Sequence, residues 1–148
     1  MKIDSNNFEE ISGRGLKIGI VVSTWNNEIT DNLYSSAKET LLANEVNQND
    51  ILKIEVPGSF ELIYGAKKMA KNNVDVIIVF GSVIKGETPH FEFICNAVSQ
   101  GIKDLNITLK KPIIFGVLTD LNINQAIERS SGKKNKGIEC AIAAIKIA

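Results

Sequence analysis

The sequence predicts an α/β fold in which a parallel sheet lies between two layers of helices. Two patterns indicate this fold: short apolar runs rich in β-branched residues alternate with longer stretches of helical periodicity, and turn residues separate the two. The chain has 148 residues, which suits one compact domain. We therefore expect a single domain over residues 1–148, in which residues 1–12 form an arm or a short extra strand.

Apolar runs predict the strands. The first run is continuously apolar, as strands of a parallel sheet tend to be when helices cover both faces. The second run stops at Pro57 and Gly58, a pair typical of turns. The predicted strands are residues 16–23, 50–56, 74–82 and 112–119.

Helical periodicity fills the intervals between these runs. Ile29, Leu33, Ala37 and Leu41 recur every four residues, which marks an amphipathic helix. The predicted helices are about residues 28–43, 59–71, 89–105, 122–130 and 135–147. This alternation implies a parallel sheet with right-handed crossovers and helices on both faces. We expect a flavodoxin-like three-layer sandwich with four strands in the order 2-1-3-4. Ligands of such sheets bind at the carboxyl ends of the strands.

Composition narrows the class of protein. Lysine and arginine number 17, as do aspartate and glutamate, so binding of nucleic acid through bulk positive charge is not expected. No apolar run reaches the length of a membrane span, and residues 1–10 lack the apolar segment of a signal peptide. We expect a cytoplasmic protein without nucleic-acid or membrane partners. Cys95 and Cys140 form no paired motif, so we expect two reduced thiols buried in helices, and neither disulfide nor zinc.

The first two strands each end in a residue that fits a ligand site. Trp25, the only tryptophan, follows the first strand, where its ring would stack on a flat heterocycle or simply close the core. Ser59 and Glu61 follow the second strand at the start of a predicted helix, with Ser59 as its cap. Glu61 suits hydrogen bonds to a polyol, but a carboxylate also favours the first turn of a helix without any ligand.

The segment after the third strand, residues 81–90, is the most informative. Thr88 is placed to cap the next helix and Pro89 to be its first residue. Free backbone N–H groups at this helix start would form an anion site, which Gly86 leaves open to a phosphate. His90, the only histidine, falls in the first turn, where the helix dipole favours its neutral form and a role in proton transfer. A histidine that only packs at a helix start explains the placement as well.

Later residues are less distinctive. Phe115 lies within the fourth strand, where most phenylalanines belong to the core. Arg129 suits a bidentate contact with phosphate. Lys136 belongs to a run of lysines, which is usually a solvated loop.

Together, these segments resemble the lumazine synthase family from residue 16 to the end of the chain. The matching pieces are Trp25-Asn26, V-P-G-S-F-E (56–61), G-S-V-I-K-G-E-T-P-H-F-E-F-I-C (81–95), P-I-I-F-G-V-L-T (112–119), N-Q-A-I-E-R (124–129) and N-K-G (135–137). The resemblance implies a transferase of riboflavin biosynthesis. Its reaction joins 5-amino-6-(D-ribitylamino)uracil to 3,4-dihydroxy-2-butanone 4-phosphate and forms 6,7-dimethyl-8-ribityllumazine, the penultimate step, without cofactor or metal.

The resemblance also implies a role for each matching residue. Trp25 would stack on the pyrimidine, the backbone of Ser82, Val83 and Ile84 would bind its polar edge, and His90 would move protons. The ribityl chain would contact Asn26 and Glu61, beside a wall formed by Ser59 and Phe60. The phosphate would lie on Gly86, Glu87 and Thr88. A neighbouring subunit would supply Phe115, Arg129 and Lys136.

The expected partners follow from the same resemblance. The chain would form a homo-oligomer, a pentamer that either stands alone or builds a decamer or a shell of sixty subunits, with riboflavin synthase as a candidate partner. Thr24, Lys85 and Pro89 depart from the residues common in the family, and the loop between Arg129 and Lys136 looks one residue shorter. These departures put the higher assembly in question and not the chemistry.

Three alternatives belong to other classes. A flavin- or pterin-binding module without turnover would keep the same fold and bind riboflavin. A phosphoacceptor receiver needs acidic residues where this chain has Ser23-Thr24 and Gly81-Ser82, so the sequence speaks against it. A shell-forming relative without activity would have no need for the combination of Glu61, His90 and Arg129.

Overall fold

The computed structural model describes residues 10–148 and confirms the predicted fold class. Its four strands are all parallel and lie in the predicted order, β2-β1-β3-β4. The elements are β1 (Ile18–Ser23), α1 (Asn27–Ala43), η1 (Gln48–Asp50), β2 (Ile51–Val56), α2 (Leu62–Met69), β3 (Val76–Ile84), α3 (His90–Thr108), β4 (Ile113–Asp120), α4 (Ile123–Arg129), η2 (Gly132–Lys134) and α5 (Lys136–Ile147).

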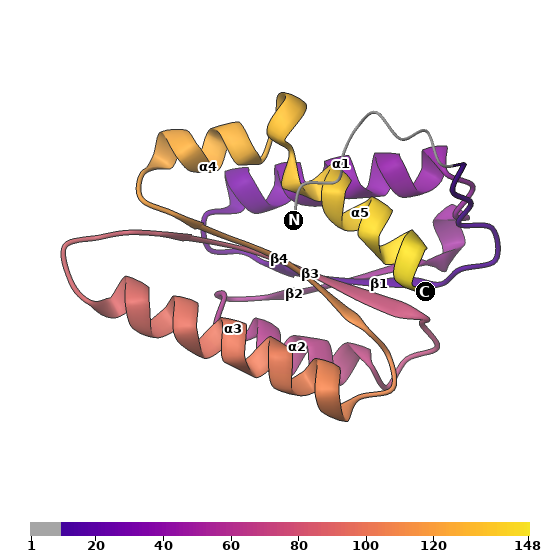
Figure 1. The fold of residues 1–148 in the computed structure, drawn as a ribbon, viewed down its shortest axis with the longest axis horizontal. Helices are drawn as coiled ribbons and strands as arrows, with labels where there is room; N and C mark the ends of the chain where they lie inside the picture. Colours follow the sequence, from indigo (N-terminus) through magenta and orange to yellow (C-terminus); the bar gives the residue numbers. More distant parts are fainter. Residues whose placement is uncertain (1–9) are drawn as a thin grey trace.

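Two helical layers enclose the sheet. Helices α1, α4 and α5 cover one face, and α2 and α3 cover the other (Figure 1). Each face of the sheet packs against its helices in an apolar core, and successive residues of β1 contribute to the two cores in turn, because side chains alternate across a strand. Ile20 packs in the core that contains Leu33 of α1, and Val21 packs in the core that contains Leu62 of α2.

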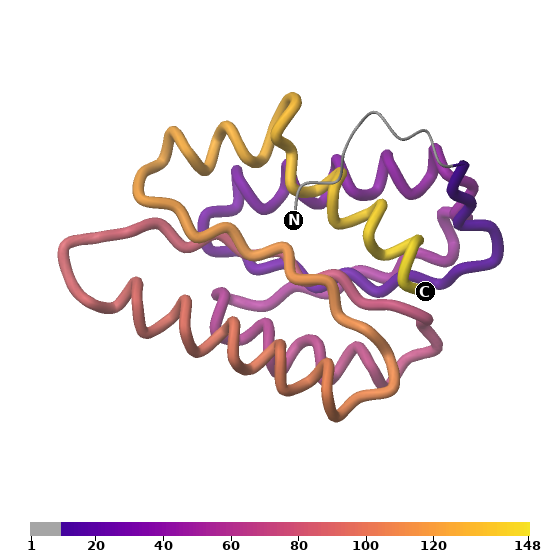
Figure 2. The backbone as a smooth tube through the Cα atoms, in the orientation of Figure 1, coloured from indigo at the N-terminus to yellow at the C-terminus, as the bar shows by residue number. Residues whose placement is uncertain are grey.

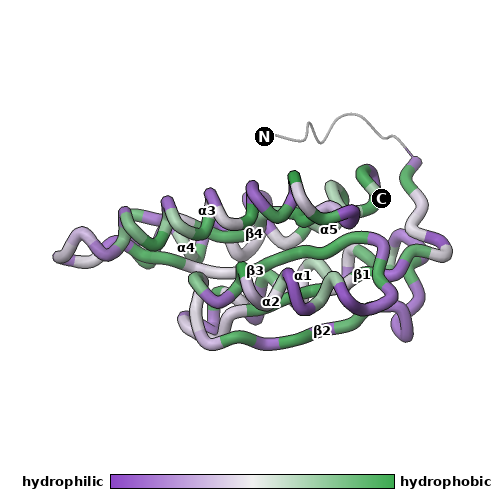
Figure 3. Tube along the Cα trace, turned by 90° about the horizontal axis from the view of Figure 1, so that it is seen from below, coloured by the Kyte–Doolittle hydropathy of each residue, from purple (hydrophilic) through white to green (hydrophobic). Residues whose placement is uncertain are grey.

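The central strands are the most deeply buried part of the chain. All six residues of β1 are buried, and β3 is drawn almost entirely in green in Figure 3. The edge strand β2 has exposed positions, among them Leu52. Continuous apolar runs therefore mark strands with helices on both faces, as the sequence predicted for β1.

Strand β3 begins and ends two residues later than predicted, at Val76 and Ile84. Its C-terminal end pairs with β4 up to the register Ile84–Asp120, and the N–H of Lys85 donates to the carbonyl of Asp120 at 2.9 Å. The sequence predicted an end at Ser82, because a glycine and a polar residue interrupt the apolar run there. Ladder hydrogen bonds with β4 outweigh that local signal.

Two helix starts differ from their predictions. Helix α2 begins at Leu62 and not at Ser59, because residues 58–61 form turns in which the Leu62 N–H bonds to the Ser59 carbonyl at 3.1 Å. Helix α3 begins at His90, with Pro89 in the cap position and no side-chain cap. The predicted caps, Ser59 and Thr88, are therefore wrong, whereas His90 does lie in the first turn.

Three other expectations concern termini, cysteines and membranes. Residues 1–9 lie outside the described part of the chain, so the predicted arm or strand is described only at residues 10–12, which form no regular element. Cys140 is buried as expected, and desolvation raises its pKa to about 12. Cys95 is only half-buried, so the prediction of two buried thiols is wrong for this residue. Among residues 10–148 no helix is long and apolar enough to cross a membrane.

Candidate active site

The carboxyl ends of all four strands meet at one edge of the sheet. The connections that leave this edge are grouped on the left of Figure 2. A cleft of about 560 Å³ opens there, between the loop after β1, the turn after β2 and the start of α3. Its lining residues are Trp25, Asn26, Gly58, Ser59, Phe60, Glu61, Ser82, Val83, Ile84, Gly86, Thr88, His90, Phe91 and Ile94.

Most of the predicted site residues line this cleft. The exceptions are Glu87, Phe115, Arg129 and Lys136. Glu87 is exposed and lies between two lining residues, whereas the other three come from β4 and the helices that follow it. One chain therefore brings together the residues expected to hold the heterocycle and the polyol. It does not add Phe115, Arg129 and Lys136, which are called the late residues below.

Trp25 stands at the mouth of the cleft and leaves its ring free. Its side chain is 71% exposed, so it does not close the core. Its backbone N–H donates to the Pro57 carbonyl at 2.9 Å, which ties the loop after β1 to the turn after β2. The residue also borders a second cavity of about 320 Å³, which reaches Ile123 of α4. An exposed indole with an anchored backbone is suited to stacking on a flat ring.

Asn26 connects the loop after β1 to β3. Its backbone is left-handed (φ 57°, ψ 47°), a conformation that asparagine tolerates better than most residues. Its side-chain Nδ2 donates to the carbonyl of Ser82 at 2.9 Å, and its own carbonyl accepts from the N–H of Ile29 at 3.0 Å at the start of α1. The amide therefore fixes the distance between the two central strands at the floor of the cleft.

The floor also contains a hydroxyl without a protein partner. Ser82 is 1% exposed, and its Oγ has no hydrogen-bond partner among residues 10–148; the same holds for Ser23 at the end of β1. Buried polar groups are usually paired, and exceptions concentrate at functional sites. Ser82 belongs to the lining of the cleft, and its Oγ is buried just beneath that lining.

The segment before α3 suits an anion. Gly86 has open space around it, because a Cβ atom there would meet nothing within 4 Å. His90 is exposed and is the first residue of the 19-residue helix α3, whose N-terminus carries partial positive charge. A phosphate near Gly86 and Thr88 would thus lie next to a side chain able to donate or accept a proton.

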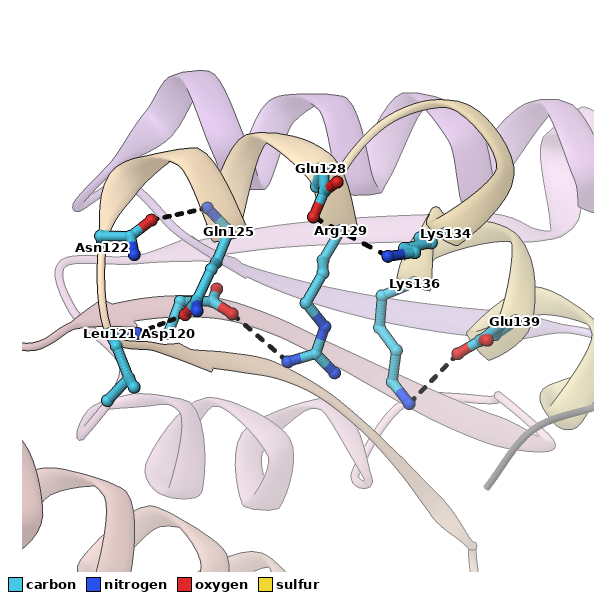
Figure 4. A network of polar contacts seen from close by, with 9 residues as sticks. All are labelled: Asp120, Leu121, Asn122, Gln125, Glu128, Arg129, Lys134, Lys136 and Glu139. Atoms are coloured by element: carbon cyan, nitrogen blue, oxygen red, sulfur yellow. Dashed lines mark hydrogen bonds and ion pairs between the residues drawn. The ribbon is translucent and has the colours of Figure 1, made fainter.

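Arg129 and Lys136 belong to a set of polar residues beside β4, whereas Phe115 does not. Arg129 Nη1 lies 3.3 Å from Asp120 Oδ1, and Lys136 Nζ lies 3.3 Å from Glu139 Oε2. Figure 4 shows the Arg129 and Lys136 side chains extending in the same direction. Phe115 lies mid-strand, half-buried against the core on the α2 and α3 side.

Asp120 was not predicted from the sequence as a site residue. Its side chain is 2% exposed, and burial raises its pKa, an effect that the neighbouring Arg129 opposes. The available signal was a carboxylate at the end of an apolar strand, at the edge where ligands bind. Gly58, Phe91 and Ile94 also line the cleft without having been predicted. No group of three or more His, Cys, Asp or Glu residues within 10–148 is arranged to hold a metal ion.

Comparison with known proteins decides the family. The family model described as 6,7-dimethyl-8-ribityllumazine synthase matches residues 15–148. The chain belongs to this family. The match begins just before β1 and ends with the chain, so every element that forms the cleft lies within the matched residues.

Relatives carry the same name at substantial identity. The 6,7-dimethyl-8-ribityllumazine synthase of Flavobacterium johnsoniae is 55% identical over 93% of this chain and 73% of its own length. That of Christiangramia forsetii is 48% identical over 100% of this chain and 94% of its own length. That of Bacteroides fragilis is 48% identical over 89% of this chain and 94% of its own length. The protein is thus an enzyme of the lumazine synthase family.

Proposed function

We propose that the protein condenses 5-amino-6-(D-ribitylamino)uracil with 3,4-dihydroxy-2-butanone 4-phosphate to give 6,7-dimethyl-8-ribityllumazine, phosphate and water. The observation that carries this proposal is the cleft, which combines an exposed indole, a polar floor and a helix start with a histidine. The indole suits a flat heterocycle, the polar floor suits a polyol, and the helix start suits a phosphate. Membership of the lumazine synthase family supports the same reaction.

The heterocycle and its ribityl chain occupy the part of the cleft between the loops. Trp25 stacks on the pyrimidine ring, and the backbone of residues 82–84 pairs with its polar edge. Asn26 and Glu61 bind the hydroxyl groups of the ribityl chain, with Ser59 and Phe60 as the wall. Because Asn26 is fixed by its bond to the Ser82 carbonyl, little side-chain entropy is lost on binding.

The sugar phosphate occupies the part nearest α3. Its phosphate lies on residues 86–88, where the open surface at Gly86 and the start of α3 favour an anion. His90 then transfers protons while the amine adds to the ketone, a Schiff base forms with loss of water, phosphate leaves, and the ring closes with loss of a second water. These are acid–base steps between aligned reactants, so alignment supplies much of the acceleration.

The late residues act from a neighbouring subunit. Arg129 and Lys136 lie outside the lining of the cleft, and β4 is an edge strand of the sheet. The exposed side chains of Leu121, Ile123 and Ile127 give the α4 region an apolar surface. We infer a cytoplasmic head-to-tail ring of five subunits in which Phe115, Arg129 and Lys136 complete the next cleft. Larger assemblies, a decamer or sixty subunits, and a complex with riboflavin synthase are extensions of this ring.

The decisive experiment mixes the purified protein with both substrates. We expect the lumazine, measured by its fluorescence, and inorganic phosphate to form in equal molar amounts. Omission of either substrate provides the control. A protein that binds riboflavin but forms neither product would be a binding module, and the proposed reaction would be rejected.

A further inference from the structure

Asp120 has an unusual environment for a carboxylate. It is the last residue of β4, and its side chain is 2% exposed. Its Oδ1 accepts from Arg129 Nη1 at 3.3 Å, while its Oδ2 is buried without a partner among residues 10–148 (Figure 4). Leu118, two residues earlier on the same face of the strand, belongs to the apolar core.

Stability alone does not explain this arrangement. A buried carboxylate with one unpaired oxygen is unfavourable, and an apolar side chain at such a position is often neutral or stabilising in comparison. Residues that break such a rule without structural gain are most often found at functional sites. Because Arg129 is the side chain that Asp120 contacts, we look for the function of Asp120 in its effect on Arg129.

The contact leaves most of the guanidinium available. Arginine has five N–H donors in one plane, and Asp120 engages a single nitrogen. The Arg129 side chain is 44% exposed, so an anion can reach it from solvent. The bond to a buried, immobile carboxylate restricts the side chain, and the negative charge of that carboxylate repels any anion that approaches the same guanidinium.

We propose that Asp120 is a positioning residue that sets the phosphate affinity of Arg129. It holds the guanidinium by one nitrogen and keeps the other donors oriented toward the anion. Its negative charge at the same time lowers the affinity of Arg129 for inorganic phosphate, so that this product dissociates after turnover. The role of Arg129 as a phosphate ligand rests on the proposed function.

The first test measures inorganic phosphate binding by calorimetry on the assembled protein. Asp120→Asn keeps an oxygen that can accept from Arg129 and removes the charge. We expect phosphate to bind at least about threefold more tightly, because screening at a half-exposed site removes only part of the lost repulsion. Glu128→Gln is the matched control, since it removes an exposed charge next to Arg129 that pairs with Lys134 at 3.9 Å, and should leave phosphate affinity unchanged.

A second pair of variants tests whether Asp120 acts through Arg129. In an Arg129→Gln background, adding Asp120→Asn should change phosphate affinity by less than about 1.5-fold, because the group on which the carboxylate acts is gone. Equal tightening in that background would overturn the proposal, as would unchanged or weaker phosphate binding by a folded Asp120→Asn protein. Asp120→Ser, also neutral, repeats the measurement if the amide does not fit.

Turnover separates this proposal from the proposed function. The Asp120→Asn variant should show stronger inhibition by inorganic phosphate and a lower KM for the sugar phosphate, with the KM for the aminouracil unchanged. A merely structural defect would not tighten one ligand selectively. If the wild-type protein forms no lumazine, the proposed function fails, and the calorimetric comparison still decides whether Asp120 controls an anion site at Arg129.

Discussion

Asp120 makes the stability of the protein depend on pH in a predictable direction. Burial raises the pKa of this carboxyl from its ordinary 3.8, and Arg129 opposes the rise. A carboxyl with a raised folded pKa binds its proton more tightly in the folded state, so its contribution to stability falls as pH rises from 3.8 through the folded pKa. The folded protein is therefore less stable once Asp120 is charged than it is at low pH, where Asp120 is protonated.

The Asp120→Asn variant should reveal this contribution. Its free energy of unfolding, relative to that of the wild-type protein, should increase from roughly pH 4 to pH 7, because only the wild-type protein acquires the buried charge. Denaturant titrations at one protein concentration measure the difference, since assembly makes stability depend on concentration. A difference that stays constant over this range would show that Asp120 keeps an ordinary pKa.

His90 provides a second prediction at this scale. His90→Ala should lower kcat by roughly 10- to 100-fold without abolishing turnover, because water replaces the acid–base group at an exposed position while the substrates remain aligned. Steady-state kinetics at saturating substrates measure the change. Glu92→Gln, in the same helix turn and outside the cleft lining, is the control. Unchanged kcat would remove His90 from the chemistry.

Individual residues were predicted unevenly from the sequence. Trp25 and His90 stood out because each is the only residue of its type and each follows a strand. The sequence left open whether Trp25 closes the core, and its exposed side chain excludes that alternative. Asp120 was not singled out, because its burial depends on α4 folding back over β4, a contact between elements that the local pattern does not contain.

The packing of α5 against α1 depends on a close backbone contact that the helical periodicity does not reveal. Gly137 lies where α5 packs against α1, and a Cβ atom there would meet the carbonyl oxygen of Leu33 at 2.4 Å. Because backbone cannot move aside as a side chain can, Gly137→Ala should destabilise the protein by about 1–3 kcal/mol. Chemical denaturation measures the loss.

A second glycine supplies the matched control for this prediction. A methyl group added at Gly86 would have no atom within 4 Å, so Gly86→Ala should leave stability nearly unchanged. It should instead raise the KM for the sugar phosphate, since the methyl group would stand where the anion approaches. Equal stability of both variants would show that α1 and α5 separate without cost.

The existence and order of the elements were easier to predict than their ends. The strand order was expected from the doubly wound, flavodoxin-like fold class that the alternation indicated, and β1 was predicted within two residues. The ends failed where tertiary contacts decide them. The pairing with β4 carries β3 to Ile84, and a series of turns delays α2 to Leu62.

The whole molecule is incomplete as a catalyst if the late residues act across an interface. Two inactive variants test this: Trp25→Ala with Glu61→Ala in one, and Phe115→Ala with Arg129→Ala in the other. After joint dissociation and reassembly, some sites would combine an intact cleft with an intact neighbour, so activity should return in part. Each variant reassembled alone is the control, and no recovery from mixed rings would reject a shared site.

The apolar side chains around α4 have a consequence for how the protein responds to cold. Leu121, Ile123 and Ile127 are each about half exposed or more in the single chain. Contacts made by such groups lose strength on cooling, because the free energy of apolar hydration carries a large heat capacity. If subunits meet through this surface, sedimentation at constant concentration should show the assembly loosening near the freezing point and tightening again at room temperature, while an interface made of ion pairs would show no such loss.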